Sequence, residues 1–123
     1  MMQLRAVRGA ITICKDDPVE IVSATEEMLL KVMELNQIQQ QNIVSIFFTV
    51  TPDIISEFPA VAARRIGLVD TPLMCAGEIP KPGSLPLCIR ALLYFYTDLQ
   101  KSEVKPVYLR EAINLRLDLT AQE

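Results

Sequence analysis

The sequence predicts an α/β fold in which helices pack on one mixed β-sheet. Three observations support this prediction. Apolar runs of strand length alternate with one long amphipathic segment, a second helical segment is short, and breaks containing Gly and Pro separate the runs. The chain has 123 residues, so we expect a single domain, residues 1–123, around one core.

The first elements are a strand and a long helix. Residues 4–13 are rich in small and β-branched side chains, which favour a strand. Asp17 then suits a helix N-cap, Pro18 the first helical position, and Glu20 is expected to complete a capping box. Apolar residues recur at helical spacing over about five turns, and Asn36 marks the expected end.

The middle of the chain alternates strands and a short helix. Residues 43–50 are β-branched and aromatic and predict a buried strand. Residues 60–66 predict a short helix that Gly67 ends, and residues 70–75 predict a shorter strand. Residues 76–85 contain two Gly and two Pro and predict a loop.

Two further segments complete the prediction. Residues 87–97 are apolar on both faces and predict a strand. The tail, residues 104–119, is expected to combine a short strand around Tyr108, a turn of helix and an extended end.

Composition excludes several kinds of partner. With 12 basic and 15 acidic residues, the net charge is −3, and nucleic acid binding requires a basic surplus. The longest apolar stretch, residues 43–50, is far shorter than the roughly 20 residues of a membrane span. Arginines interrupt the first apolar run, so we expect no secretory signal. Cys14, Cys75 and Cys88 are widely spaced, which indicates free thiols and a cytoplasmic protein.

The chain contains no histidine. Histidine is the commonest general acid or base and the commonest zinc ligand, and it activates most serine and cysteine nucleophiles. An enzyme with this composition must therefore act without a side chain poised near neutral pH. Half of the residues are hydrophobic, which favours burial of apolar surface between subunits.

Arginines occur in apolar strand contexts. Arg90 lies within residues 87–97, and Arg8 lies in the first predicted strand. An unpaired buried charge costs several kcal/mol, so each arginine needs an anion. One interpretation is an internal ion pair, for example between Arg90 and Glu78. The other is a pocket for a multiply charged anion, because few acids match the arginines in these contexts. The arginines counted here are Arg8, Arg64, Arg65, Arg90 and Arg116.

Ordered motifs along nearly the whole chain resemble one family, the monofunctional, trimeric α/β class of chorismate mutase. The runs that carry the resemblance are Val7-Arg8-Gly9-Ala10, Thr51-Pro52-Asp53, Phe58-Pro59-Ala60 with Arg64, Cys75-Ala76-Gly77-Glu78, Leu87-Cys88-Ile89-Arg90, Val107-Tyr108-Leu109, Leu115-Arg116 and Asp118-Leu119. The resemblance implies a pseudo-α/β-barrel homotrimer with active sites at subunit interfaces. It also implies the Claisen rearrangement of chorismate to prephenate in phenylalanine and tyrosine biosynthesis, without a cofactor or metal.

The resemblance assigns roles to residues. Arg90 is expected to face the ether oxygen, Arg8 and Tyr108 to hold a carboxylate, and Glu78 to accept a hydrogen bond from the ring hydroxyl with help from Cys75. Arg64 and Arg116 would close over the pocket, and Phe58 and Leu115 would wall it. The full expected site is catalytic Arg90, Glu78 and Arg8, and substrate-binding Arg8, Phe58, Arg64, Met74, Cys75, Ala76, Gly77, Glu78, Arg90, Tyr108, Leu115 and Arg116.

Two alternatives stay open. A trimer related to imine deaminases would also use an arginine for a substrate carboxylate, but it would leave Glu78 and Leu115-Arg116 unexplained. A trimer that only binds a small carboxylate would have no need for Arg90 at an ether oxygen. Where the family pattern leads us to expect a lysine, this chain has Val61, and Leu73-Met74 replaces a smaller, more polar pair. Both departures bear on affinity for the substrate dianion.

Overall fold

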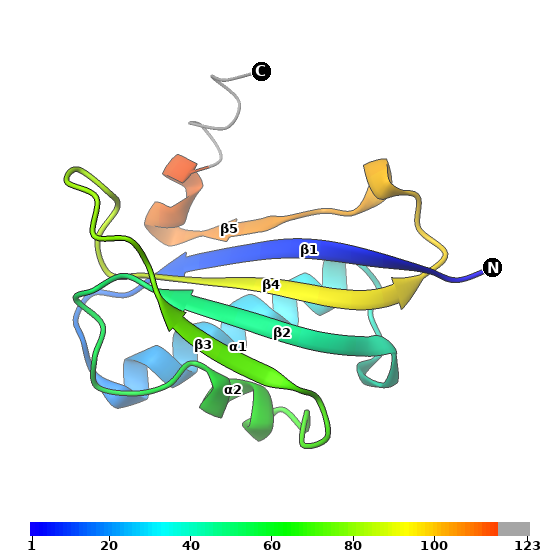
Figure 1. Cartoon of the computed structure of the whole chain (residues 1–123), viewed down its shortest axis with the longest axis horizontal. Coiled ribbons are helices and arrows are strands. Elements are labelled where there is room, and N and C mark those ends of the chain that lie inside the picture. The colour runs from blue at the N-terminus through cyan, green and yellow to red at the C-terminus, as the bar shows by residue number, and fades with distance from the viewer. Residues whose placement is uncertain (116–123) are drawn as a thin grey trace.

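The computed structural model describes residues 1–115, whose strands form a five-stranded sheet of order β3-β2-β4-β1-β5. Strand β4 runs antiparallel to both β1 and β2, whereas β3 and β5 pair in parallel with β2 and β1. The sheet is therefore mixed, as predicted (Figure 1). The strands are β1 (Gln3–Thr12), β2 (Ile43–Val50), β3 (Leu73–Gly77), β4 (Cys88–Thr97) and β5 (Val107–Leu109).

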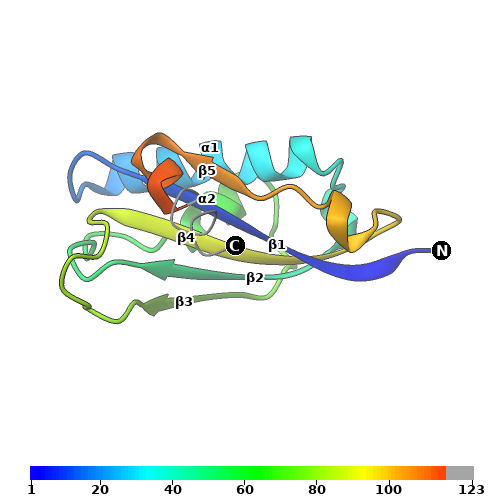
Figure 2. The same cartoon turned by 90° about the horizontal axis from the view of Figure 1, so that it is seen from above.

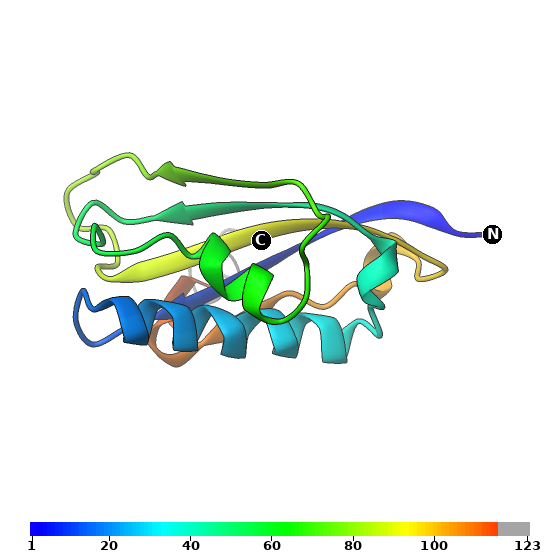
Figure 3. The ribbon, with the colours of Figure 1, turned by 90° about the horizontal axis from the view of Figure 1, so that it is seen from below.

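Two helices cover one face of the sheet. Helix α1 (Pro18–Leu35) and helix α2 (Ala60–Arg65) lie behind the strands in Figure 1 and in front of them in Figure 3. Strand β5 lies along β1 close to α1 (Figure 2). One long and one short helix on a single mixed sheet confirm the predicted fold class. Neither helix is long and apolar enough to cross a membrane, within the residues that the structure describes.

The core lies between the helices and the sheet. Alternate side chains of the strands point toward α1, and the apolar stripe of α1 meets them. The largest of these side chains are fully buried: Phe48, Phe95, Ile11, Ile21, Met28, Leu29, Ile46, Ile89, Leu93 and Val32.

Gly9 sets the distance between β1 and α1. A Cβ atom at this position would lie 3.0 Å from Cγ2 of Val32 and 3.1 Å from Cγ of Met28. Only glycine lets the strand approach the helix so closely without repacking. The same strand carries Arg8 and Ala10 on its other face, so this packing also positions part of the site described below.

The start of α1 confirms one predicted contact and corrects another. The Asp17 side chain accepts a hydrogen bond from the Glu20 backbone N–H at 3.0 Å, as an N-cap should. The Glu20 carboxylate does not return to the Asp17 backbone, so the capping box is incomplete. The Glu20 carboxylate accepts instead from the backbone N–H of Cys14, six residues earlier in the chain, because the chain turns back there from β1 into α1.

The third strand lies later in the sequence than predicted. Residues 70–75 were the expected strand, whereas β3 is Leu73–Gly77. The strand begins after Pro72, which lacks a backbone N–H, although its carbonyl still accepts from Ile46 at 3.1 Å. Ala76 and Gly77 therefore belong to β3 rather than to the loop that follows. Single 3-10 turns at Gln40–Asn42 and Lys101–Glu103 were not predicted.

The face of the sheet opposite the helices carries exposed apolar side chains. Phe47 and Met74 are neighbours across β2 and β3, and Leu4 and Tyr96 are neighbours across β1 and β4. All four are exposed in the single chain, Met74 at 65%. An apolar surface of this kind is typical of subunit interfaces.

Candidate active site

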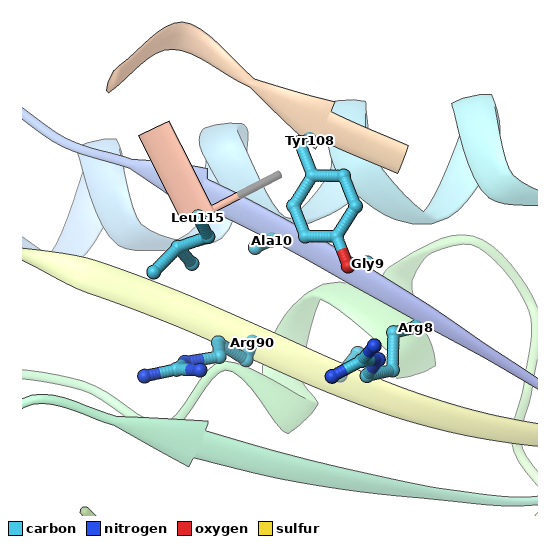
Figure 4. Close-up of a pocket in the computed structure, with 7 residues that line it drawn as sticks. Arg8, Gly9, Ala10, Arg90, Tyr108 and Leu115 are labelled. Carbon is cyan, nitrogen blue, oxygen red and sulfur yellow. The ribbon is translucent and has the colours of Figure 1, made fainter. Parts of the chain in front are cut away.

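A pocket opens on this uncovered face where β4, β1 and β5 lie side by side. In the strand register, Ala10 stands opposite Arg90 of β4 and opposite Tyr108 of β5. Because Ala10 has only a methyl group, the larger side chains around it enclose a cavity of about 150 Å³. Figure 4 shows Arg8, Arg90, Tyr108 and Leu115 gathered around this hollow.

The two arginines of the pocket differ in their partners. Arg8 makes no ion pair or side-chain hydrogen bond within residues 1–115. Arg90 forms a two-pronged ion pair with Glu78: Nε donates to Oε2 at 3.1 Å and Nη2 donates to Oε1 at 2.9 Å. The internal ion pair considered from the sequence is therefore confirmed, whereas no carboxylate among residues 1–115 pairs with Arg8.

Neither arginine is buried in the single chain. The side chain of Arg90 is 44% exposed, and Arg8 is exposed as well. The expectation of buried charge was wrong for one chain, because the helices cover only the opposite face of the sheet. Glu78, in contrast, is only 14% exposed at its side chain.

Glu78 is held by three neighbouring segments. It directly follows β3, and its backbone N–H donates to the carbonyl of Val50 at 2.9 Å. Its Oε2 accepts from Arg90 and also from the Thr49 hydroxyl at 2.6 Å. Thr49 was not predicted as a site residue. The signal for it is long-range, since Thr49 faces Arg90 only in the register of β2 with β4.

The Thr51-Pro52-Asp53 motif positions the start of β4. Thr51 Oγ1 accepts from the backbone N–H of Cys88 at 3.0 Å, and Asp53 Oδ2 accepts from that of Leu87 at 2.9 Å. Leu87 has a φ of 51°, in the left-handed region that non-glycine residues rarely adopt. These bonds hold the strained residue in place and align β4 three residues before Arg90.

Arg110 holds in place the C-terminal segment that lines the pocket, as Thr51 and Asp53 hold the start of β4. Its φ is 56°, which turns the chain sharply after β5. Its Nη1 donates to the carbonyl of Thr12 at 3.1 Å and its Nη2 to Oε1 of Glu27 at 3.2 Å. The sequence did not single out Arg110, yet it ties the segment between Tyr108 and Leu115 to β1 and α1.

The remaining expected site residues lie elsewhere in the chain. Phe58 is 68% exposed before α2, Arg64 is exposed on α2, and Met74 is exposed on β3. Cys75 packs against the core on the helix side of the sheet. Ala76 and Gly77 end β3 beside the ion pair, and Arg116 lies outside the described residues. One chain thus brings together Arg8, Glu78, Arg90, Tyr108 and Leu115.

A buried thiol adjoins the pocket. Burial raises the pKa of Cys88 to about 11, although the charge of Arg90 acts in the opposite direction. The thiol is therefore neutral at physiological pH and unsuited to nucleophilic attack. No group of three or more metal-ligating side chains is present between residues 1 and 115.

A second hollow continues the first. Its volume is about 450 Å³, and it shares Arg90 and Leu115 with the smaller pocket. Lys81 and Asn114 add a positive charge and an amide to its lining. The cationic surface therefore extends beyond Arg8 and Arg90 along the loop after β3.

An open mixed sheet with helices on one face and an arginine-lined pocket on the other defines an α/β protein suited to a small anion. Comparison with known proteins makes the assignment specific, because residues 4–119 match the model of the family chorismate mutase type I. The chain belongs to the chorismate mutase type I family, and it is an isomerase of that class.

Individual relatives match along almost their whole length. The chorismate mutase AroH of Thermus thermophilus is 49% identical over 121 residues, covering 98% of this chain and 99% of that protein. The AroH of Bacillus subtilis is 34% identical over 120 residues, covering 97% and 94%. A solved chorismate mutase from Clostridium thermocellum superposes with a TM-score of 0.88 at 44% identity, covering 89% of this chain and 97% of that one.

Proposed function

We propose that this chain converts chorismate to prephenate in the pocket around Ala10. The observation that carries the proposal is Arg90, fixed by Glu78 yet still lining the cavity. Its Nη1 has no hydrogen-bond partner within residues 1–115. A full, oriented positive charge with donors to spare is what a developing negative charge on oxygen requires.

The rearrangement needs no side chain that gains or loses a proton. One C–O bond of the enol ether breaks while a C–C bond forms, and the electrons move around a single ring of six atoms. Atoms and charge are conserved within the substrate. A chain without histidine is suited to such a step, since it supplies only geometry and electrostatics.

Arg90 supplies the electrostatic part in this proposal. Negative charge grows on the ether oxygen as the C–O bond breaks, and the guanidinium stabilises it. A preorganised donor of this kind contributes about 3–4 kcal/mol to lowering the barrier. A 10⁶-fold acceleration, at the low end for enzymes, needs about 8 kcal/mol in total. Selection of the compact substrate conformer is proposed to supply much of the remainder.

The other pocket residues orient the substrate. Arg8 is proposed to bind a carboxylate together with the hydroxyl of Tyr108. Glu78 is proposed to accept a hydrogen bond from the ring hydroxyl. An ionised carboxylate has about four lone-pair sites, and three donors already reach Glu78, two from Arg90 and one from Thr49. One site therefore remains for the substrate.

A homotrimer with active sites between subunits is the proposed assembly. Phe58, Arg64 and Met74 are expected site residues, yet they lie apart from the pocket of their own chain. The same residues of a neighbouring copy could complete the pocket, with the exposed apolar sheet face buried in the contact. The assistance of Cys75 to Glu78 and the closing role of Arg116 stay predictions. We further propose a single cytoplasmic domain, supported by three free cysteines.

Arg90→Lys tests the proposed function. The substitution keeps the charge but loses the planar fork that pairs with Glu78, so kcat should fall by at least about a hundredfold. Turnover is followed as loss of the ultraviolet absorbance of chorismate, because the rearrangement removes the conjugated diene of its ring. Arg65→Lys is the matched control, because Arg65 is an exposed arginine paired with Glu26 on the helix side. It should leave kcat unchanged.

Two results would count against the proposal. Unchanged turnover in Arg90→Lys would remove Arg90 from the chemical step. A wild-type protein that binds prephenate tightly but does not consume chorismate would support a binding trimer instead. Loss of chorismate absorbance also separates this activity from an imine deaminase, which would leave the conjugated diene intact.

A further inference from the structure

We propose that Thr49 is a positioning residue for the reaction, acting through Glu78 on Arg90. This inference rests on the roles proposed above for Glu78 and Arg90. Thr49 lies on β2 directly opposite Arg90 of β4, on the open face of the sheet. Its hydroxyl donates to Glu78 Oε2 at 2.6 Å, the same oxygen that accepts from Nε of Arg90 at 3.1 Å.

The carboxylate of Glu78 needs this additional restraint. Glu78 follows the last residue of β3, so β-sheet pairing no longer holds its backbone beyond the one bond to Val50. Its side chain has three rotatable bonds, whose freedom opposes any single geometry. Thr49 lies near the end of β2 but is paired on both sides, with Ala76 of β3 and Arg90 of β4, and a β-branched side chain has a restricted χ1. The hydroxyl is therefore a fixed point to which the carboxylate is anchored.

The anchored carboxylate in turn aligns the guanidinium. With Oε2 held by Thr49, both oxygens of Glu78 face Nε and Nη2 of Arg90, and Nη1 is left without a partner within residues 1–115 while Arg90 lines the cavity. Without the hydroxyl, the carboxylate can rotate and carry the guanidinium with it. Because Arg90 is proposed to act in the transition state, this misalignment should slow the chemical step more than it weakens substrate binding.

A purely structural role for Thr49 makes the opposite prediction for two variants. Valine has the shape of threonine and favours strands, whereas serine keeps the hydroxyl and favours strands less. If Thr49 matters only for the strand, Thr49→Val is harmless and Thr49→Ser is damaging. If the hydroxyl anchors Glu78, the order reverses.

The first experiment measures kcat and KM of both variants in the full-length protein. A hydrogen bond to a charged group is worth a ten- to hundredfold change in rate, so kcat of Thr49→Val should fall about tenfold or more. Its KM should change less than about threefold, and Thr49→Ser should stay within about threefold of wild type in both. Thr97→Val, a matched threonine at the far end of β4, should leave kcat unchanged.

A double-mutant cycle tests the route through Glu78. Thr49→Val should slow the wild type but have no further effect in a Glu78→Ala background, where nothing remains to be anchored. Equal losses in both backgrounds, or a Thr49→Val protein as fast as wild type, overturn the inference. Thermal unfolding of each variant establishes that it is folded.

The cycle also separates this inference from the proposed site. A slow Glu78→Ala with an unimpaired Thr49→Val overturns only the role of Thr49. A fully active Glu78→Ala overturns the role proposed for Glu78, and the positioning role falls with it.

Discussion

Single residues decide the shape of the pocket, and Ala10 is the clearest case. It lies between Arg90 and Tyr108 in the sheet, and its side chain is buried with Cys88 and Ala112 beneath the cavity. Any larger side chain at this position must project into the space where the substrate is proposed to bind. Arg8 and Arg90 would then no longer line an open cavity that can hold an anion.

Ala10→Leu should therefore abolish most of the activity while the protein stays folded. We expect kcat/KM to fall about a hundredfold, and overpacking to cost roughly 1–3 kcal/mol of stability. Steady-state kinetics and urea unfolding measure the two effects. Ala10→Gly leaves the hollow open and should retain most of the activity. Comparable losses in both variants would show that the cavity does not hold the substrate.

At the scale of elements, loops are anchored by single polar side chains. Asp16, before α1, accepts through Oδ1 from the backbone N–H groups of Ile55 and Ser56, both at 3.1 Å, and from the Ser56 hydroxyl at 2.8 Å. These bonds tie residues 53–58 to the chain reversal ahead of α1. The segment leads to Phe58, an expected wall residue. The hydroxyl of Ser56 above all, with both backbone N–H groups, lowers the pKa of Asp16 below its usual value, against the opposing effect of desolvation.

This lowered pKa predicts a pH-dependent contribution to stability. Because the folded value lies below the unfolded one, the ionised Asp16 stabilises the fold fully above about pH 4. The contribution is lost as pH falls through the folded pKa. In urea unfolding, the free energy of unfolding of wild type should exceed that of Asp16→Asn at pH 7 and approach it as pH falls through the folded pKa of Asp16. The single variant Ser56→Ala, which keeps Asp16 but removes one of its donors, should be less stable than wild type at pH 7. A gap between the two proteins that is independent of pH would refute the anchoring role.

At the scale of the whole molecule, the two faces of the sheet differ. The helix face is sealed by α1 and α2, whereas the open face exposes apolar side chains on four strands. The pocket opens on that same face, and several expected site residues lie outside the pocket of their own chain. Assembly and activity should therefore depend on each other.

Phe47→Glu tests this link by placing a charge on the open face. We expect the variant to sediment as a smaller species than wild type and to lose most of its activity, because charge is disfavoured in an apolar interface. Leu30→Glu places the same charge at an exposed apolar position on α1. It should change neither property. A fully active Phe47→Glu monomer would contradict sites shared between subunits.

Much of the fold was predictable because its signals are local. Asp17 and Pro18 mark the start of α1, and the β-branched run that forms β2 lies where it was expected. The capping box failed because the partner of Glu20 comes from residues before the helix. The boundary of β3 failed because Ala76 and Gly77 look like loop residues and are strand residues only by pairing with β2.

The candidate site was only partly predictable for a related reason. Arg8, Glu78, Arg90 and Tyr108 stood out through residue type and through resemblance to a family. Thr49 and Arg110 did not, because their importance depends on which groups they face across the sheet.

The sequence by itself determined most of the helices and strands and the ordered motifs of the chorismate mutase type I family. It also determined that histidine is absent, and hence a chemistry without an imidazole acid or base. Only the tertiary structure decided that β4 lies between β1 and β2. That order puts Arg90 between Ala10 on one side and Thr49 on the other. Glu78, which directly follows β3, then lies close enough to pair with Arg90. The reason is physical: periodicity and capping act between near neighbours in the chain, whereas strand order follows from burying apolar faces far apart in sequence.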